Sequence, residues 1–399
     1  MNTYKAILAA ALGLASVSLA SATQYVYITG STAARGAVVN ALAAGVGQDA
    51  TPSAVIYTGS AASTGSYQEF VTSIGGNATI IKTAWSGSEA GILDVSSSTQ
   101  TELFLLDPST GSVPASGAIN PAPATPNANY YSAQTVNAAL ADNSPLASKN
   151  PTTTATFKLA GVVVPFVFVK NQGAGLTTLG ESDYSAFSNL TSDQFKVLAA
   201  GGDYLGLFTG NPADQATFVY LAGRDDNAGA RVNALAETGV GIKTSLSQVI
   251  LANGVLTPAA YTDEGQASSG TLAKSLIDTT SPTVQTDSIQ GTSGFNVVSY
   301  LGVPDAVTAE AAPINAIQLT YNGVAYSATA VENGTYAFWG YEFVGWKAGS
   351  ATYIQNLVNT LANTSTGVGS SAYNDGSEIG LSNVHVSRAD SLPTNPPVE

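Results

Sequence analysis

Three segments of the chain repeat one order: a short apolar run typical of a β-strand, a turn that contains glycine, and a stretch with the composition of a helix. They lie at residues 25–44, 78–92 and 217–231. A strand that passes through a tight turn into a helix is the unit from which α/β folds are built, and their ligands bind at the carboxyl ends of the strands. The repeated order therefore predicts an α/β fold with a site formed by the three turns.

The third turn, at residues 223–231, carries two of the four arginines, Arg224 and Arg231, in a chain of net charge −14. The first N–H groups of a helix point toward one place, and the helix dipole favours negative charge there. Arginine adds a forked and permanently charged donor. The turn therefore indicates an anion site. The alternative is a solvated turn in which an arginine forms a surface ion pair with Asp225 or Asp226.

The first 22 residues have the three parts of a secretory signal: Lys5, an apolar run over residues 6–19, and a small-residue stretch that ends at Ala22. Cleavage after Ala22 is expected. The run is too short for an ordinary membrane-spanning helix, and no later segment offers about twenty uninterrupted apolar residues. Because the chain has no cysteine, no cysteine can carry a lipid. We expect an exported protein, periplasmic or secreted, that is neither lipid-anchored nor embedded in a membrane.

Size and composition exclude several classes of protein. About 375 residues remain after cleavage, more than one hydrophobic core usually organises, so two lobes are expected. Nucleic acid is excluded as a partner because the net negative charge repels phosphates and no basic stripe is visible. His385 is the only histidine, which excludes a histidine-rich metal site and leaves any serine triad dependent on it. We expect no catalytic residue, no metal and no cofactor.

Two further segments predict local structure. Residues 159–169 form the densest apolar run, which predicts a strand buried on both faces, with a bend or crossover at Pro165. Residues 190–202 predict a helix that is capped by Thr191 or Ser192 and ended by two glycines.

Taken in order, six stretches of the chain resemble the phosphate-binding proteins of bacterial ABC phosphate transporters, which have the type II periplasmic binding protein fold. The similarity spans most of the chain after the signal. The stretches are 28–35 and 87–91, similar to the first two glycine-rich ligand loops; 136–146, similar to the aspartate segment; 189–198, similar to the Leu-Thr-x-x-Gln-Leu helix; 223–231, similar to the Arg-x-Asp-Gly-Ser-Gly-Thr turn; and 332–339, similar to the Asn-Gly-Thr-Tyr segment.

The resemblance implies two lobes, each a mixed and mostly parallel sheet flanked by helices. The first lobe combines residues 23–157 with 295–399, and the second contains residues 158–294. Two crossings at a hinge allow the lobes to open and close. Within the first lobe, residues 107–129 are rich in Pro, Ser, Gly and Ala without a sustained period, which predicts a long surface loop or insertion.

The resemblance also implies which residues bind the ligand. Arg224 donates to a bound oxyanion, and serine hydroxyls and backbone N–H groups complete the cage. Asp142 corresponds to the family's ligand-binding aspartate; it would accept the proton of hydrogen phosphate, which sulfate lacks at neutral pH. The expected ligand-binding set is Ser31, Thr32, Arg35, Ser88, Asp142, Arg224, Gly229 and Ala230.

The chain departs from the family's pattern at three places. Ala228 and Ala230 stand where the third loop of the family supplies hydroxyl groups, so those two hydrogen bonds cannot form. Glu89 puts a carboxylate beside the expected anion, unless it points away or accepts from an arginine. The aspartate follows the second loop by more residues than in the family, which leaves Asp107 as a rival to Asp142.

Several of these residues also have a plainer interpretation. Asp142 fits a turn or helix-capping aspartate, Ser88 a turn serine, and Arg35 a charge on a helix surface. The aromatic residues between positions 336 and 346 alternate in places like a strand, which favours packing over a stacking platform for a ligand.

The predicted function is that of an exported, monomeric solute-binding protein that captures inorganic phosphate or a related oxyanion between its lobes. It hands the ligand to an ABC-type permease and performs no bond chemistry. The alternative keeps the fold but serves as an extracellular surface or interaction protein that has lost phosphate binding. A phosphate-ester hydrolase is disfavoured because the sequence shows neither a metal-ligand cluster nor a nucleophile and base pair.

Overall fold

The computed structural model describes residues 22–111, 113–119, 128–150, 154–172, 182–259, 264–277, 286–389 and 397–398. The expected signal segment lies outside these residues except for Ala22. Within the described part of the chain, no helix has the length and apolar character needed to cross a bilayer.

The described chain contains both helices and strands. The α-helices are α1 (Arg35–Ala43), α2 (Ser88–Ser96), α3 (Ser192–Ala199), α4 (Gly206–Thr209), α5 (Gly229–Glu237), α6 (Ser269–Ser275), α7 (Val303–Glu310), α8 (Ala328–Glu332) and α9 (Thr352–Leu361). The strands are β1 (Gln24–Gly30), β2 (Ala54–Tyr57), β3 (Tyr67–Ile74), β4 (Asn77–Ala84), β5 (Thr101–Leu105), β6 (Gly117–Ala118), β7 (Tyr131–Thr135), β8 (Ala138–Ala141), β9 (Ala155–Lys170), β10 (Asn189–Leu190), β11 (Asp203–Tyr204), β12 (Phe218–Leu221), β13 (Val249–Ala252), β14 (Val255–Pro258), β15 (Thr286–Asp287), β16 (Thr292–Ser293), β17 (Asn296–Gly302), β18 (Ile317–Gln318), β19 (Thr320–Tyr321), β20 (Trp339–Lys347) and β21 (Ile379–Gly380).

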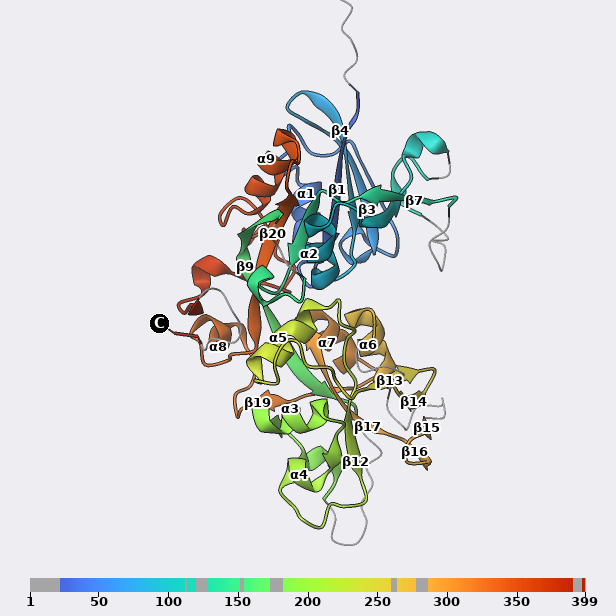
Figure 1. Ribbon diagram of the computed structural model, residues 1–399, viewed down its shortest axis with the longest axis vertical. Coiled ribbons are helices and arrows are strands. Elements are labelled where there is room, and N and C mark those ends of the chain that lie inside the picture. Colours follow the sequence, from blue (N-terminus) through green and yellow to red (C-terminus); the bar gives the residue numbers. More distant parts are fainter. Residues whose placement is uncertain are drawn as a thin grey trace, which may run out of the picture.

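The structure has two lobes, one above the other along the long axis (Figure 1). Strands β1 to β4 lie in the upper lobe, and β12, β17 and helices α3 to α7 lie in the lower one (Figure 1). One sheet runs through both, in the order β11-β12-β17-β9-β20-β8-β1-β4-β3-β2-β6, with β18 and β21 also paired to β9. The predicted α/β architecture of two lobes with mixed sheets and flanking helices is confirmed.

Parallel pairing is less extensive than expected. Parallel pairs join β1 to β4 and β8, β2 to β6, and β12 to β17, whereas the other pairs along this sheet are antiparallel. The physical reason lies partly in the connections. Strands β3 and β4 are joined through Gly75 and Gly76, both at positive φ, and so short a turn can link only antiparallel neighbours.

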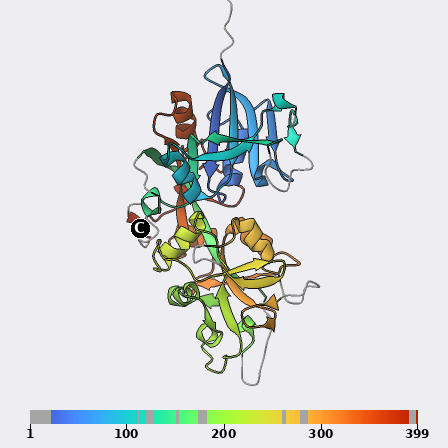
Figure 2. The same cartoon turned by 45° about the vertical axis from the view of Figure 1, so that its right-hand side comes forward.

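Strand β9 connects the lobes. In Figure 2, β9 (green) and β20 (orange) lie between the upper and the lower lobe. Its first part pairs with β20 up to Pro165, and from Phe166 onward it pairs with β17. Pro165 thus lies where the strand changes partner, as the sequence predicted. The predicted burial is also confirmed, because every residue from Ala160 to Lys170 is buried. Residues of β9 belong to the hydrophobic clusters of both lobes.

The three strand, turn and helix units form as predicted: β1 leads into α1, β4 into α2, and β12 into α5. The capped helix is also confirmed. Thr191 is the N-cap of α3, and its hydroxyl accepts from the N–H of Gln194 while the Gln194 side chain accepts from the N–H of Thr191. Gly201 and Gly202 follow the helix at positive φ.

Two expectations concern the first lobe. Residues 107–129 are predicted as a long surface loop or insertion; their described part contributes the edge strand β6 on β2, and Val113 and Ile119 are buried in a small hydrophobic cluster with Ile56. The lobe boundaries remain a prediction. Since β17 pairs with β12, and the upper lobe resumes its pairing only at Trp339, we propose moving the second boundary from residue 295 to about residue 338.

Replacing Thr191 by Ala should lower the free energy of unfolding by about 1 kcal/mol, because the cap on the N–H of Gln194 is lost. Urea unfolding followed by circular dichroism measures the change. Thr191→Ser keeps the hydroxyl and should lose much less. Equal losses in the two variants would show that the threonine methyl group, and not the cap, accounts for the effect.

Candidate functional site

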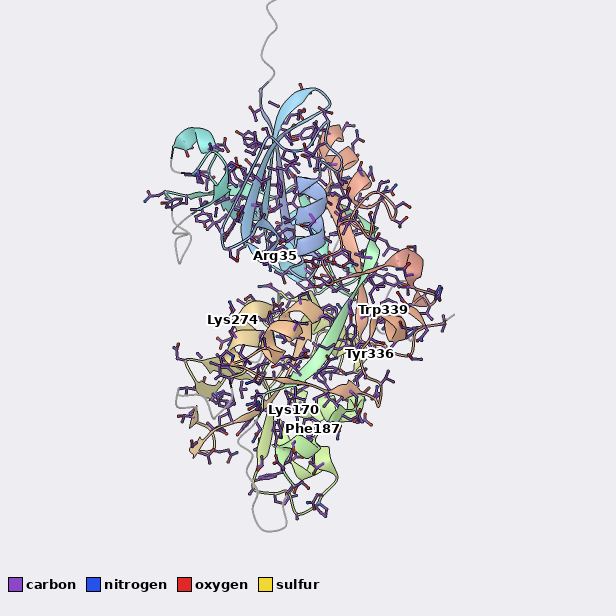
Figure 3. The ribbon with its side chains drawn as sticks, turned by 180° about the vertical axis from the view of Figure 1, so that it is seen from behind. Arg35, Lys170, Phe187, Lys274, Tyr336 and Trp339 are labelled. Atoms are coloured by element: carbon purple, nitrogen blue, oxygen red, sulfur yellow. The ribbon has the colours of Figure 1, made fainter. Side chains whose placement is uncertain are left out.

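A cavity of about 420 Å³ lies between the lobes, at the ends of β1, β4, β8 and β12. We call it the interlobe cavity. The turns of all three strand, turn and helix units contribute residues to its lining. Its lining from the upper lobe includes Thr32, Arg35, Trp85, Gly87, Ser88 and Asp142, and its lining from the lower lobe includes Arg224, Ala228, Gly229, Ala230, Lys274 and Asp305. Figure 3 shows Arg35 at the lower edge of the upper lobe and Lys274 at the upper edge of the lower lobe.

The structure brings the expected ligand-binding residues together. Thr32, Arg35, Ser88, Asp142, Arg224, Gly229 and Ala230 all line the interlobe cavity. Ser31 does not; it is fully buried and its hydroxyl lies behind Asp142. Whether these residues bind a ligand remains a prediction, but their convergence from four separate stretches of the chain is an observation of the structure.

Asp142 occupies the centre of this arrangement because it directly follows β8. Its Oδ1 accepts from the Ser88 hydroxyl at 2.8 Å, and its own N–H donates to the same hydroxyl oxygen at 3.1 Å. Ser31 Oγ lies 3.2 Å from Oδ2. Burial raises the pKa of Asp142 above its usual value, and the Ser88 hydrogen bond and the charge of Arg224 offset this only in part. The carboxylate is therefore held by neutral donors, with a guanidinium nearby.

Helix α5 begins directly against this carboxylate. A Cβ atom added to Gly229 would lie 1.6 Å from Asp142 Oδ1, so only glycine allows the approach. The Asn233 side chain, one turn further along α5, donates to the backbone oxygen of Asp142 at 2.8 Å. Because a helix N-terminus attracts negative charge, the approach of α5 to the Asp142 carboxylate favours contact between the two lobes at a residue that lines the cavity.

Arg224 is buried and fixed in place. Its Nε donates to the Gln266 carbonyl at 2.9 Å, Nη2 donates to the Ala267 carbonyl at 3.1 Å, and Nη1 donates to the Ser269 hydroxyl. These bonds use three of the five N–H groups of a guanidinium. The other arginine of the turn, Arg231, is not part of the cavity lining; its Nη1 donates to the Arg224 carbonyl at 3.5 Å. The predicted anion-binding turn therefore presents one arginine to the cavity.

Charges of both signs surround the rest of the interlobe cavity. Arg35 donates from Nε to the Ser63 carbonyl at 3.2 Å, and burial lowers its pKa although Asp305 and Asp375 raise it. Burial raises the pKa of Asp305, and nearby Arg35, Arg224 and Lys274 lower it. These cations come from both lobes, so an anion between them would be attracted from both sides.

Two questions left open by the sequence are answered by the positions of the carboxylates. Glu89 points away from the cavity: its oxygens accept from Asn143, Ser148 and the backbone of Lys149. Asp107 lies in the upper lobe, where Lys82 Nζ donates to it at 2.5 Å and Tyr25 donates at 2.5 Å. Of the two candidates, Asp142 lines the cavity and Asp107 does not, while Asp305 and Asp375 line it as well. The assignment of the ligand-binding aspartate to Asp142 stays a prediction.

The aromatic segment packs in the interior, as its alternation favoured. Tyr336, Phe338 and Trp339 are buried, and the Phe338 ring stacks on Phe168 with centroids 4.5 Å apart. None of these residues lines the interlobe cavity. Figure 3 places Tyr336 and Trp339 beside the strands that join the lobes. Among the described residues, no group of three His, Cys, Asp or Glu side chains is positioned to hold a metal ion.

Sequence reasoning missed Lys274 and Asp305, which lie on α6 and α7. Asp305 follows Pro304 in the first turn of α7, a common position for an acidic residue, so its sequence signal is that of an ordinary helix start. Lys274 carries no motif. Only the packing of α6 beside α7 brings both side chains to the cavity.

Comparison with known proteins gives similarity at the level of solved structures. No family model matches the sequence, and no curated protein matches it. A Clostridium perfringens protein described as a phosphate ABC transporter substrate-binding protein with bound phosphate is 11% identical, covers 85% of this chain and 93% of its own, and has a TM-score of 0.41. PstS from Borrelia burgdorferi is 10% identical over 90% and 98% of the two chains, with a TM-score of 0.39.

An ABC-type phosphate transport receptor from Vibrio cholerae is 10% identical, with coverage of 83% and 93% and a TM-score of 0.40. All three belong to the class of protein that the sequence motifs resemble. Similarity at these identities and TM-scores does not assign a ligand to this chain, so the case for its function rests on the geometry of the interlobe cavity.

Replacing Gly229 by Ala should disrupt the site, because the new Cβ would lie 1.6 Å from Asp142 Oδ1, a carboxylate held by the hydroxyls of Ser88 and Ser31. We expect a loss of about 1–3 kcal/mol in unfolding free energy, the range for overpacking a buried position. Urea unfolding measures it. Gly270→Ala is the matched control at the same cavity, since its Cβ would meet Asp305 Oδ1 at 3.5 Å, an ordinary contact. A Gly229→Ala variant as stable as the control would contradict the close approach.

Proposed function

We propose that this chain is a solute-binding protein that captures phosphate or a phosphate-like oxyanion in the interlobe cavity. The observation that carries the proposal is the meeting of Ser88 and Asp142 from one lobe with Arg224 and the start of α5 from the other. A ligand in this cavity touches both lobes at once, which is how two-lobed binding proteins couple capture to closure.

The chemistry of the lining suits an oxyanion. The first N–H groups of a helix have no partner within it, and at α5 these belong to Gly229 and Ala230. Arg224 adds a charged donor. Its hydrogen bonds to two backbone carbonyls already hold the side chain in place, so little side-chain entropy is lost when it binds a ligand. The alanines at positions 228 and 230 offer no hydroxyl, and the backbone N–H groups and Thr32 take that role in our proposal.

Asp142 supplies the selectivity in this proposal. An oxyanion that bears a proton can donate it to the carboxylate, whereas a fully ionised oxyanion such as sulfate would place oxygen lone pairs against a buried acceptor. The cavity volume of about 420 Å³ falls within the range of about 300–1,000 Å³ that is usual for small-molecule sites, so it also leaves room for a group attached to the phosphate.

We further propose export to the periplasm or the cell exterior, monomeric function and delivery of the ligand to an ABC-type permease, with no bond chemistry. Three cations line the cavity beside the carboxylates of Asp142, Asp305 and Asp375. Because the chain has only 13 Lys and Arg, placing three of them here favours anion capture over the alternative of a surface protein that has lost its ligand.

Isothermal titration of the protein, freed of copurified anion by unfolding and refolding, should show phosphate binding that Arg224→Gln weakens by roughly 30-fold, because removing a buried charged donor costs about 2 kcal/mol or more. Lys196→Gln is the control: it removes one positive charge on α3, far from the cavity, and should bind as the unmodified protein does. Folded protein that shows no heat with phosphate or sulfate would favour the interaction-protein alternative.

Asp142→Asn should narrow the preference for phosphate over sulfate by at least about tenfold, because the amide no longer repels a fully ionised oxygen and a hydrogen bond to a charged group contributes about 1.5–3 kcal/mol. Parallel titrations with both anions measure the ratio. Asp226→Asn is the matched control, since Asp226 pairs with Lys149 outside the cavity lining. An unchanged ratio in Asp142→Asn would mean that the carboxylate does not face the bound ligand.

A further inference from the structure

The hydroxyl of Ser31 lies between two buried carboxyl groups. Ser31 Oγ is 3.2 Å from Asp142 Oδ2 and 3.2 Å from Glu342 Oε2. Ser31 and Glu342 are fully buried, and Asp142 is almost so. Glu342 comes from β20 and Ser31 from the turn after β1, so three strands of the upper lobe place these groups together.

A count of hydrogens favours an extra proton in this chain of groups. A serine hydroxyl has one hydrogen and two acceptor positions. If both carboxyl groups were ionised, the single hydroxyl hydrogen could serve only one of them, and the other contact would be a repulsive one between two oxygen lone pairs. Two negative charges would also lie close together in the protein interior. One proton shared among these groups removes both costs: one carboxyl donates to Ser31, and Ser31 donates to the other.

The surroundings favour Glu342 as the carrier of that proton. Asp142 accepts from Ser88 at 2.8 Å, lies near Arg224 and faces the interlobe cavity. Glu342 has no comparable support: its Oε1 is buried without a hydrogen-bond partner among the described residues. Burial raises the pKa of Glu342 well above its usual value, and the charge of Asp142 raises it further.

Of the other groups that act on Glu342, Glu378 raises its pKa and the Ser31 hydrogen bond lowers it, but the net direction is upward. Glu378, just before β21, is almost fully buried, and its charge also raises the pKa of Glu342. Burial and the charge of Asp375 raise the pKa of Glu378 itself. Arg224, across the cavity, acts on Asp142 instead. No cation among the described residues is paired with Glu342 within salt-bridge distance.

We propose that Glu342 is a positioning residue that holds one proton at neutral pH, donates it to Ser31 and thereby directs the Ser31 hydroxyl to Asp142, so that Asp142 stays an ionised acceptor. The Ser31 hydroxyl then donates its hydrogen bond to Asp142 and does not contact the ligand. The consequence for ligand choice rests on the proposed function. A protonated Asp142 could donate a hydrogen bond to sulfate and would no longer exclude it. The proton on Glu342 keeps Asp142 ionised and so preserves the discrimination against sulfate.

Infrared spectroscopy tests the proton position without any ligand. The carbonyl stretch of a protonated carboxylic acid is distinct from that of a carboxylate, so at pH 7 the Glu342→Gln variant should lose one such band that Asp142→Asn retains. Glu378→Gln shows whether the neighbouring carboxyl group, whose pKa burial also raises, contributes a band of its own. Retention of every band in Glu342→Gln, or loss of the band in Asp142→Asn only, would overturn the proposal. Because no anion is added, this result stands apart from the proposed function.

Titration with phosphate and sulfate then tests the consequence for the site. In Glu342→Gln the amide is uncharged and can donate to Ser31, as the protonated acid can. The ratio of phosphate affinity to sulfate affinity should therefore change by less than about twofold. If Glu342 were ionised and Asp142 protonated, the same substitution would release the proton from Asp142 and change the ratio by tenfold or more, which would overturn the proposal. If neither protein binds either anion, the proposed function fails while the infrared result still decides the proton position.

Discussion

The structure depends on β9, one strand that belongs to both lobes. Its buried run from Ala160 to Lys170 supplies side chains to the hydrophobic clusters of the upper and the lower lobe, and its pairing partner changes from β20 to β17 at Pro165. Proline has no N–H for a ladder bond, so it suits the point where one neighbour leaves and another begins. The lobes are therefore joined through continuous backbone pairing as well as through packing, and the strand ends that line the interlobe cavity are placed relative to this shared element.

The contact between Asp142 and the start of α5 is the second element on which the site depends. It brings a buried carboxylate within the field of a helix N-terminus and leaves no room for a side chain at Gly229. Around it the chain uses neutral hydroxyls and backbone groups, with a single arginine of the turn fixed by three bonds. In a protein with 13 Lys and Arg against 27 Asp and Glu, Arg35, Arg224 and Lys274 at one cavity balance the carboxylates of Asp142, Asp305 and Asp375, whereas acidic residues outnumber basic ones in the chain as a whole.

Much of the fold was predictable because its signals are local. The capping box of Thr191 and Gln194 depends on residues three positions apart, and the strand over 159–169 is evident from an unbroken apolar run. The site was predictable where it depends on turns between a strand and a helix, which brought Ser88, Arg224 and Gly229 to the cavity. The mixed direction of the sheet was less evident, because strand pairing depends on how distant segments meet, and the burial of Val113 and Ile119 depended on a partner strand more than fifty residues away.

The sequence by itself determined an α/β chain with three turns suited to an anion, because periodicity, glycine turns and caps act over a few residues. Only the tertiary structure decided that Asp142 and not Asp107 faces the cavity, that Glu89 turns away from it, and that Lys274 and Asp305 reach it. It also placed Glu342 beside Ser31, which is 311 positions earlier in the chain. The protonation of such a pair is set by burial and by neighbouring charges, and these exist only once distant strands have packed together.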